Sequence, residues 1–339
     1  MYIYRLRMLD FTHFKSFLKY PIRRSVRRSL VLLAGLAVSV QCAHTIPHNP
    51  IRGTEDSRPR LSGERQEQKP EAEPRRGLTG QEVFEAFGEA YPDRIEETGY
   101  RDGDWALRID GKWFYWAEGR LLPEEIRKDW RNYSRHPFYR YPKELPPLRV
   151  LSGEEKEELK VRLESREANP PARHPGLYNA LWELHDRETS WNKVKTTYFL
   201  GLKTLIHRDL LEDLADVEET IYTAARTSPE VQRFIDSLAQ LEGYSWRRIS
   251  GTASLSFHSY GAAVDLLPRS YGGKQAYWRW TMSYFEEWYT IPYEDRFSPP
   301  REVIEAFEIH GFIWGGKWFY FDSIHFEYRP ELLVLSGMR

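Results

Sequence analysis

The stretch Ser256-Phe-His258-Ser-Tyr-Gly261-Ala-Ala-Val-Asp265 decides how this part of the chain folds. The run Ala-Ala-Val-Asp-Leu-Leu at 262–267 favours a strand. Residues an odd number of positions apart lie on opposite faces of a straight strand. His258 and Asp265 therefore meet only if the chain bends at 259–261. Glycine is the residue type that such a bend needs, and Gly261 lies there.

A second segment near the C-terminus, Asp322-Ser-Ile-His325-Phe-Glu327, offers the same kinds of side chain. The separation of Asp322 and His325 is also odd, so Asp322 should lie in a turn before a strand that carries His325. Imidazole and carboxylate suit zinc, which in a catalytic site takes three protein ligands and leaves one position for a water. A nearby carboxylate can take the proton of that water and pass it to a leaving amine. Together the two segments predict a zinc hydrolase site.

Most of the 10 histidines have a simpler explanation than metal binding. His310 ends a helix predicted over 301–310, where a positive charge complements the helix dipole. The others lie in polar segments or have no motif around them: His13, His44, His48, His136, His174, His185 and His207. The sequence contains no His-Glu-x-x-His motif, which excludes a thermolysin-type site. Either pair alone also fits a core or surface histidine, so the metal assignment depends on combining the two segments.

The N-terminus is basic and is followed by a short apolar run. Residues 30–40 (LVLLAGLAVSV) are too few to cross a bilayer comfortably as a helix. A basic region, a short apolar stretch and the small-x-small site Ala37-Val-Ser39 are typical of a secretory signal. An uncleaved anchor or a buried helix is the alternative, and translation could also begin at Met8. We expect residues 1–42 to be a signal peptide or lipoprotein signal and the protein to be exported to the periplasm or cell envelope.

Cys42 is the only cysteine, which excludes an intrachain disulfide. It follows the apolar run at the place where bacterial lipoproteins carry their lipidated cysteine. The preceding Ser39-Val-Gln41 is a poor match, because Gln at the last position is large. Lipid anchoring at Cys42, which would tether the chain to a membrane, therefore stays an alternative to simple secretion.

Composition divides the remainder of the chain. Residues 43–78 are rich in Pro, Arg, Glu and Gln and predict a disordered linker, because they cannot bury enough apolar surface to offset the entropy of ordering. The 339-residue chain has 41% hydrophobic residues, enough for a packed core, and its net charge of −1 gives no argument for a nucleic-acid partner. We place an accessory region at 79–190 and a catalytic domain at 191–339.

Local signals give a coarse map of elements after residue 79. A short helix is predicted over 81–90, and Asp110-Gly111 between two aromatic and β-branched runs predicts a hairpin. Residues 120–150 are expected to wrap the surface. Helical signals dominate 152–241, with a capping box at Ser152 and an N-cap at Ser228, and short strands follow. The absence of a βαβ rhythm favours an α+β fold with a small antiparallel sheet and flanking helices.

The pattern Ser-x-His-x-x-Gly-x-Ala-x-Asp, followed later by Asp-x-x-His-Phe-Glu, resembles a family of peptidoglycan peptidases. These are the zinc D-alanyl-D-alanine carboxypeptidases and L-alanyl-D-glutamate endopeptidases, the VanY-type group that includes phage endolysins. Tyr244-Ser-Trp246-Arg247 is similar to an aromatic-Arg element of that family. Gly311-Phe-Ile-Trp314-Gly-Gly-Lys-Trp318 is similar to the segment before its second histidine. The resemblance covers about residues 200–330 and implies a Hedgehog/DD-peptidase-like zinc peptidase domain.

The resemblance also implies roles for single residues. His258, Asp265 and His325 would bind one zinc ion. Asp322 would act as the general base and acid. Arg247 would bind the substrate carboxylate or the developing oxyanion, which suits a fixed guanidinium, although its neighbour Arg248 is an alternative.

Three further residues have open assignments. Ser256 would line the substrate site, with a turn hydroxyl as the alternative. Trp314 belongs to the family-like segment and also fits a core aromatic. Glu327 is expected to be a hydrogen-bond partner of a ligand and not a ligand itself.

We therefore expect an exported zinc metallopeptidase that hydrolyses stem peptides of peptidoglycan. A non-catalytic cell-wall or protein-binding module is the alternative, although a binder has no need for a carboxylate such as Asp322 beside the metal. A structural envelope lipoprotein whose function lies in residues 80–190 is a third possibility. The bond that is cut stays open: a carboxypeptidase needs a pocket that ends at a free carboxylate, whereas an endopeptidase needs an open groove.

Overall fold

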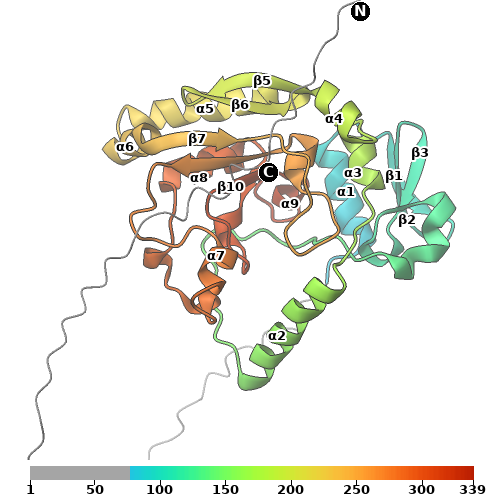
Figure 1. The fold of residues 1–339 in the computed structure, drawn as a ribbon. Coiled ribbons are helices and arrows are strands. Elements are labelled where there is room, and N and C mark those ends of the chain that lie inside the picture. The colour runs from blue at the N-terminus through green and yellow to red at the C-terminus, as the bar shows by residue number, and fades with distance from the viewer. Residues whose placement is uncertain (1–76) are drawn as a thin grey trace, which may run out of the picture. The chain divides into compact units, whose positions relative to one another are not determined.

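The structure, a computed structural model, describes residues 77–339. The predicted signal, the linker up to residue 76 and Cys42 lie outside the described residues. The described residues belong to one compact unit. Within it, helices are interspersed with three small antiparallel sheets, which confirms the predicted α+β class (Figure 1).

The sheet that carries the predicted site has the strand order β7-β8-β10-β9. Its strands are β7 (Leu238–Glu242), β8 (Ala263–Pro268), β9 (Phe312–Trp314) and β10 (His325–Tyr328). The inner strands β8 and β10 pair antiparallel, with Asp265 directly opposite His325. The intervening residue Phe326 points to the other face, where its ring stacks on Phe307 at a centroid distance of 4.0 Å. One face of β10 therefore faces the core and the other carries the polar site.

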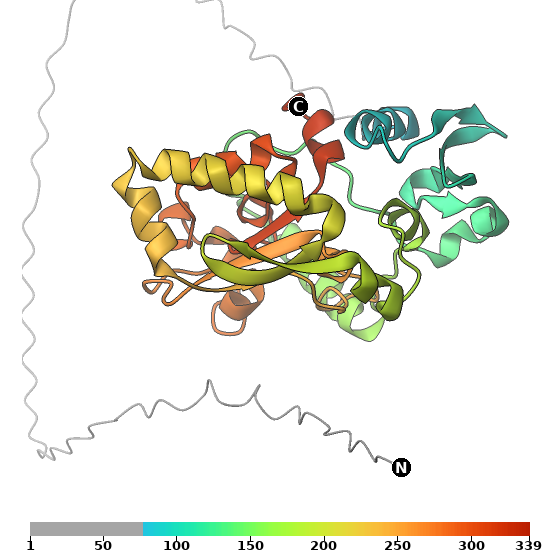
Figure 2. The ribbon, with the colours of Figure 1, turned by 90° about the horizontal axis from the view of Figure 1, so that it is seen from above.

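A two-stranded hairpin lies beside this sheet. It consists of β5 (Val194–Phe199) and β6 (Leu202–His207), joined at Leu200 and Gly201, whose φ values are 50° and 76°. The prediction of mainly helical structure over 152–241 is wrong here, because residues 194–199 are rich in β-branched and aromatic side chains, which favour a strand, and a tight turn with glycine follows them. In Figure 2 the helix α5 (Leu211–Ala225) runs alongside this hairpin.

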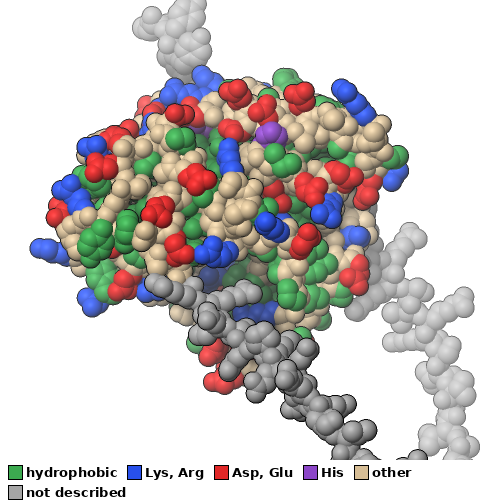
Figure 3. Space-filling model, turned by 180° about the vertical axis from the view of Figure 1, so that it is seen from behind, with side chains coloured by type: hydrophobic (Ala, Val, Ile, Leu, Met, Phe, Trp, Pro, Cys, Tyr) green, Lys and Arg blue, Asp and Glu red, His purple; other side chains and the backbone are tan. Residues whose placement is uncertain are grey.

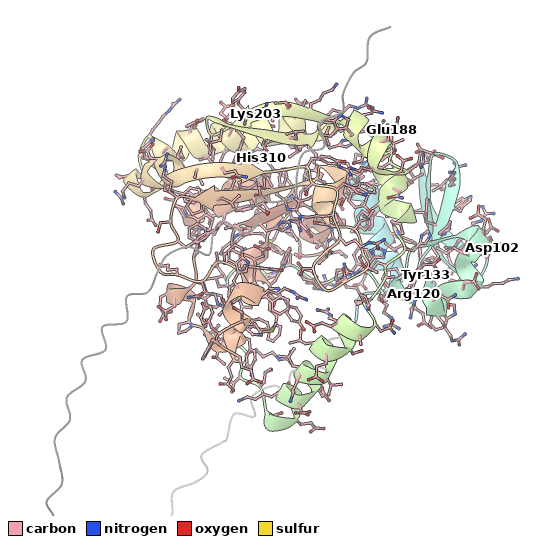
Figure 4. All side chains as sticks on the ribbon, in the orientation of Figure 1. Asp102, Arg120, Tyr133, Glu188, Lys203 and His310 are labelled. Carbon is pink, nitrogen blue, oxygen red and sulfur yellow. The ribbon has the colours of Figure 1, made fainter. Side chains whose placement is uncertain are left out.

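A four-stranded sheet belongs to the N-terminal part. Its strands, in sheet order, are β1 (Glu97–Arg101), β2 (Asp104–Ile109), β3 (Lys112–Tyr115) and β4 (Leu122–Pro123). The predicted hairpin at Asp110-Gly111 is confirmed, and both turn residues have positive φ (50° and 71°). Arg120 donates to the carbonyl of Tyr133 at 3.0 Å, which ties the sheet to the segment that leads toward α2 (Gly153–Ala168) (Figure 4).

Capping residues bound the helices where the sequence predicts. The capping box of Ser152 is formed, Ser228 is an N-cap before Pro229, and Gly311 follows the last turn of α8 (Arg301–Ile309) with a φ of 93°. His310 is the C-cap of α8, and its Nε2 contacts the hydroxyl of Thr220 at 3.0 Å (Figure 4). The remaining helices are α1 (Gly80–Ala90), α2 (Gly153–Ala168), α3 (Gly176–Leu181), α4 (Arg187–Lys193), α6 (Pro229–Ser237), α7 (Trp278–Met282), α8 (Arg301–Ile309) and α9 (Pro330–Val334).

The predicted accessory region and the predicted catalytic domain share a core. One hydrophobic cluster includes Phe87 from α1 as well as Phe307 from α8. The expectation that residues 120–150 wrap the surface is wrong at Tyr141, which is 2% exposed. Its hydroxyl donates to Glu308 at 2.5 Å and accepts from the backbone N–H of Trp314 at 3.0 Å, so burial is compensated by hydrogen bonds. Among residues 77–339, no helix combines the length and the hydropathy needed to cross a bilayer.

Candidate active site

The bend predicted before β8 is present. A short 3₁₀ turn covers Phe257–Tyr260, and Gly261 ends it in the left-handed conformation with a φ of 67°. A Cβ at Gly261 would lie 2.7 Å from the backbone nitrogen of His207, which donates to the Gly261 carbonyl at 2.8 Å. The tight packing of the turn on the β5–β6 hairpin therefore requires glycine. This turn reverses the chain direction, so that the side chains of His258 and Asp265 face each other.

Three predicted ligands converge on one point. The Oδ1 atom of Asp265 lies 3.2 Å from His258 Nε2 and 2.8 Å from His325 Nδ1, and the two nitrogens are 3.2 Å apart. All three side chains are buried, with exposed fractions of 1–7%. His258 comes from the turn, Asp265 from β8 and His325 from β10. Their grouping is one that could hold a metal ion.

The outer nitrogens of both histidines have acceptors. His258 Nδ1 donates to the carbonyl of Gly243 at 2.5 Å, and His325 Nε2 donates to Glu327 at 3.2 Å. These bonds leave His258 Nε2 and His325 Nδ1 as the inward, metal-facing atoms, which is the usual arrangement around zinc-binding histidines. Glu327 in turn accepts from Arg329 at 3.2 Å.

The charge balance of the group fits a bound cation. Burial lowers the pKa of His325, but the hydrogen bonds to Asp265 and Glu327 outweigh it and raise that pKa to about 10. Burial raises the pKa of Asp265, but His258 and His325 hold it well below its ordinary value. In the metal-free protein a proton on His325 thus supplies the positive charge that the buried carboxylate needs. Zinc binding would replace this proton, because a ligating imidazole nitrogen must be deprotonated.

We expect Glu327→Gln to weaken zinc binding by about 10–100-fold, as is typical when the hydrogen-bond partner of a ligating histidine is changed. Gln retains the acceptor oxygen but loses the charge that orients and polarises the imidazole. Titration of the apo protein against a chromogenic zinc chelator measures the effect. Glu242→Gln is the control, because Glu242 is exposed on the neighbouring strand β7. Equal zinc affinity of the two variants would contradict the assignment of Glu327.

Asp322 lies in the turn before β10, as the sequence predicts. Its backbone N–H donates to the carbonyl of Gly315 at 3.0 Å, and its carbonyl accepts from the N–H of His325 at 3.2 Å. Its Oδ1 is buried and has no hydrogen-bond partner among the described residues. Burial, together with the charge of Asp265, raises the pKa of Asp322 to about 7. A carboxyl group with such a pKa can both accept and return a proton near neutral pH.

The structure separates the two adjacent arginines. Arg247 Nη2 lies 3.9 Å from Asp265 Oδ2, at the edge of the ligand group. The buried hydroxyl of Ser259 accepts from the backbone N–H of Arg247 and donates to its carbonyl, at 3.0 and 2.7 Å. Arg248 donates to the carbonyl of Ala253 instead. The geometry thus favours Arg247 over Arg248 at the site, and Ser259, which the sequence does not single out, fixes its backbone.

Ser256 and Trp314 have structural contacts. The Ser256 hydroxyl accepts from the N–H of His258 at 3.4 Å, and the same residue also borders the cavity described below. Trp314 is 3% exposed, and its Nε1 donates to the carbonyl of Ser323 at 2.9 Å. A Cβ at Gly316 would lie 2.0 Å from the Trp314 ring, so this glycine lets the chain pass over the indole. Trp314 holds the loop that presents Asp322.

A cavity of about 740 Å³ opens beside the ligand group. Arg247, Ser256, Asp322 and His325 border it, so the predicted site residues that are not sealed in the core share one space. Its other walls are aromatic, proline-rich and basic, and they include segments around 136–149 and 277–296. Figure 3 shows a recess on one face of the molecule with Lys and Arg side chains at its edge.

Comparison with known protein families matches two segments of the chain. Residues 250–328 match a family model described as D-alanyl-D-alanine carboxypeptidase. This segment contains the three candidate ligands and Asp322, while Arg247 lies just before it. Residues 83–138, which include most of α1 and the four-stranded sheet, match a family described as a domain of unknown function. Neither the curated proteins nor the solved structures gave a match.

Proposed function

We propose, from the match of residues 250–328 to the D-alanyl-D-alanine carboxypeptidase family model, that the chain is an exported zinc carboxypeptidase acting on peptidoglycan stem peptides. One observation carries the proposal. The buried His258–Asp265–His325 group lies beside Asp322, a carboxyl group with a buried oxygen that no donor within residues 77–339 satisfies. A site built only for binding or stability has no use for such a group, because an unpaired buried oxygen costs free energy.

Each residue has a defined task in this reaction. Zinc, when bound by His258, Asp265 and His325, would supply a Lewis acid that lowers the pKa of a water. Asp322 would accept the proton of the attacking water and return it to the leaving amine. Its pKa near 7 suits both transfers. Arg247, whose guanidinium reaches the edge of the ligand group, would donate to the oxyanion that develops on the scissile carbonyl.

Digestion of a synthetic stem pentapeptide ending in D-Ala-D-Ala tests the activity and the bond. We expect the zinc-loaded protein to release one terminal D-Ala, seen by mass spectrometry as a shortened tetrapeptide. A chelator should stop the reaction, and added zinc should restore it. Cleavage between L-Ala and D-Glu would instead assign endopeptidase action. Binding of the peptide without any cleavage would favour a non-catalytic cell-wall module.

The cellular location is part of the same proposal and rests on the sequence alone. Export through the signal in residues 1–42 would bring the protein to its substrate in the periplasm or cell envelope. Lipidation at Cys42 would in addition hold it at a membrane. Fractionation of cells that express the wild-type chain or Cys42→Ser separates these cases: only a lipid anchor predicts that the substitution moves the protein from membranes to the soluble periplasmic fraction.

A further inference from the structure

The cavity beside the ligand group carries an excess of positive charge. Its acidic lining residues are Asp322 and Glu327, whereas eight of its lining residues are Arg or Lys. Some of these cations are neutralised by the protein itself. Lys317, for example, lies 2.7 Å from Glu308, and Arg149 lies 2.7 Å from Glu155. The excess is therefore concentrated in the cations that lack such a partner.

Three lining arginines have no ion pair within residues 77–339: Arg166, Arg173 and Arg296. They come from separate elements. Arg166 lies in the last turn of α2, Arg173 in the segment between α2 and α3, and Arg296 in the long segment between the two ligand motifs. Two of the three thus lie outside the segment that matches the carboxypeptidase family.

Arg296 is the most firmly held of the three. The residue is only 4% exposed. Its Nε donates to the carbonyl of Ile291 at 3.0 Å and its Nη2 to that of Tyr289 at 3.3 Å. The guanidinium lies over the rings of Phe321 and Tyr293, at 4.3 and 4.7 Å from their centroids. Nη1 has no hydrogen-bond acceptor in the described part of the chain.

A buried arginine of this kind is costly without a counter-charge. Burial lowers the pKa of Arg296, which reflects the loss of hydration, and the two aromatic rings compensate only part of it. A guanidinium fixed by two carbonyls loses little entropy when it binds a carboxylate. Phe321, on which it lies, directly precedes Asp322 in the chain. Arg296 thus flanks the segment that presents the proposed general base.

Arg166 and Arg173 add positive charge to the cavity from α2 and from the segment that follows it. The Arg166 guanidinium lies 5.1 Å from the ring centroid of Tyr320, the residue before Phe321. The backbone N–H of Arg173 donates to the hydroxyl of Ser254 at 3.0 Å. Ser254 borders the cavity close to Ser256. Burial and the neighbouring Arg329 lower the pKa of Arg173, and the charge of Glu327 offsets only part of this effect.

We propose that the cavity is a subsite for an acidic peptide, in which Arg296 binds one peptide carboxylate and Arg166 and Arg173 attract a second or guide its entry. This inference rests on the proposed function, since it specifies the substrate class of the same site. The shared chemistry is a carboxylate, which could be the C-terminal group of the peptide or an acidic side chain. A purely structural Arg296 would explain its bonds to Tyr289 and Ile291, but it would not explain the unpaired charges of Arg166 and Arg173 in the same cavity.

The test compares the zinc-loaded full chain on a stem peptide and on copies in which single carboxylates are amidated. We expect the wild-type KM to be about 10–100-fold higher for the copy that lacks the recognised carboxylate than for the unmodified peptide. A factor of this size corresponds to the loss of one charge-assisted hydrogen bond. Arg296→Gln should raise KM for the charged peptide by a similar factor and leave that of the amidated copy almost unchanged, with kcat within about twofold. The amidated copy with the raised wild-type KM identifies the peptide carboxylate that Arg296 binds.

Arg166→Gln and Arg173→Gln provide the second arm, because their side chains hold no described backbone group. Each should raise KM for the charged peptide and reduce its dependence on salt. Lys160→Gln, exposed on the same helix α2 and absent from this cavity, is the matched control and should change neither. Thermal melts show whether Arg296→Gln is folded. If it is not folded, the KM values of Arg166→Gln and Arg173→Gln decide whether the subsite exists.

Two negative results are distinguishable. Equal KM values of wild type for charged and amidated peptides would overturn the acidic subsite while leaving the peptidase intact. If no peptide is hydrolysed, the proposed function fails, and calorimetric binding of the same peptides then tests the subsite alone. In that measurement, equal affinity for the charged and amidated forms overturns it, and tighter binding of the charged form supports it.

Discussion

Asp322→Asn is expected to lower kcat by about 10²–10⁴-fold while the protein still binds one zinc ion. The amide has nearly the same shape as the carboxyl group, so the turn held by Gly315 and His325 should persist. It cannot accept the proton of the attacking water. Zinc content by mass spectrometry and hydrolysis of the stem peptide measure the two properties separately. Asp216→Asn, on the exposed face of α5, is the control, and wild-type activity of Asp322→Asn would refute the assigned base.

The same variant should make the metal-free protein more stable at neutral and higher pH. The folded-state pKa of Asp322 is raised to about 7, above that of the unfolded chain, so its contribution to stability is present at low pH and lost as the pH rises through 7. Asn carries no charge and avoids this loss. We expect a gain of about 1–3 kcal/mol at pH 8 and little difference below pH 4, measured by thermal melts with a chelator. A uniform shift at both pH values would show that charge is not the cause.

Gly261→Ala is expected to destabilise the protein by about 2–4 kcal/mol and to weaken zinc binding as well. The left-handed backbone costs a non-glycine residue about 1–2 kcal/mol. The new methyl group would also lie 2.7 Å from the backbone nitrogen of His207 and 2.8 Å from Val194, so the hairpin or the turn must shift. Because the turn carries His258, any shift moves one ligand away from the other two.

Gly272→Ala separates the two causes. Gly272 also has a positive φ, 60°, but a Cβ there would meet nothing within 4 Å. It should therefore lose only the backbone part of the stability, about 1–2 kcal/mol, and keep wild-type zinc affinity. Urea unfolding gives the stabilities, and the chelator titration gives the affinities. Equal losses in the two variants would show that crowding at Gly261 plays no part.

The sequence is most informative where simple geometry leaves one solution. The odd spacing of His258 and Asp265 requires a bend, and the structure has it at Gly261. The same reasoning correctly places Asp322 in a turn before β10. These predictions depend only on the alternation of side chains along a strand and on the conformational freedom of glycine. Neither requires knowledge of distant parts of the chain.

Features that depend on distant contacts are not visible in the sequence. The choice between Arg247 and Arg248 is decided by Ser259, which holds the Arg247 backbone from across a turn. Arg296 reaches Phe321 only because the segment between the ligand motifs folds back on the cavity wall. The β5–β6 hairpin was predictable in principle, since β5 is rich in β-branched and aromatic residues and meets β6 at a Leu-Gly turn, but helical signals on both sides of the hairpin obscure it.

The contacts behind His325 extend well beyond the metal site. Glu327 is held by Arg329, which also donates to Glu331 in α9, and Glu331 accepts from the hydroxyl of Tyr91 at 3.0 Å. Tyr91 follows α1, at the far end of the described chain. Metal affinity is thus a property of the whole folded unit and not of the ligand motifs alone. We therefore expect any process that detaches α1, such as partial unfolding or cleavage just before Gly80, to weaken binding of the proposed zinc ion although it changes no ligand.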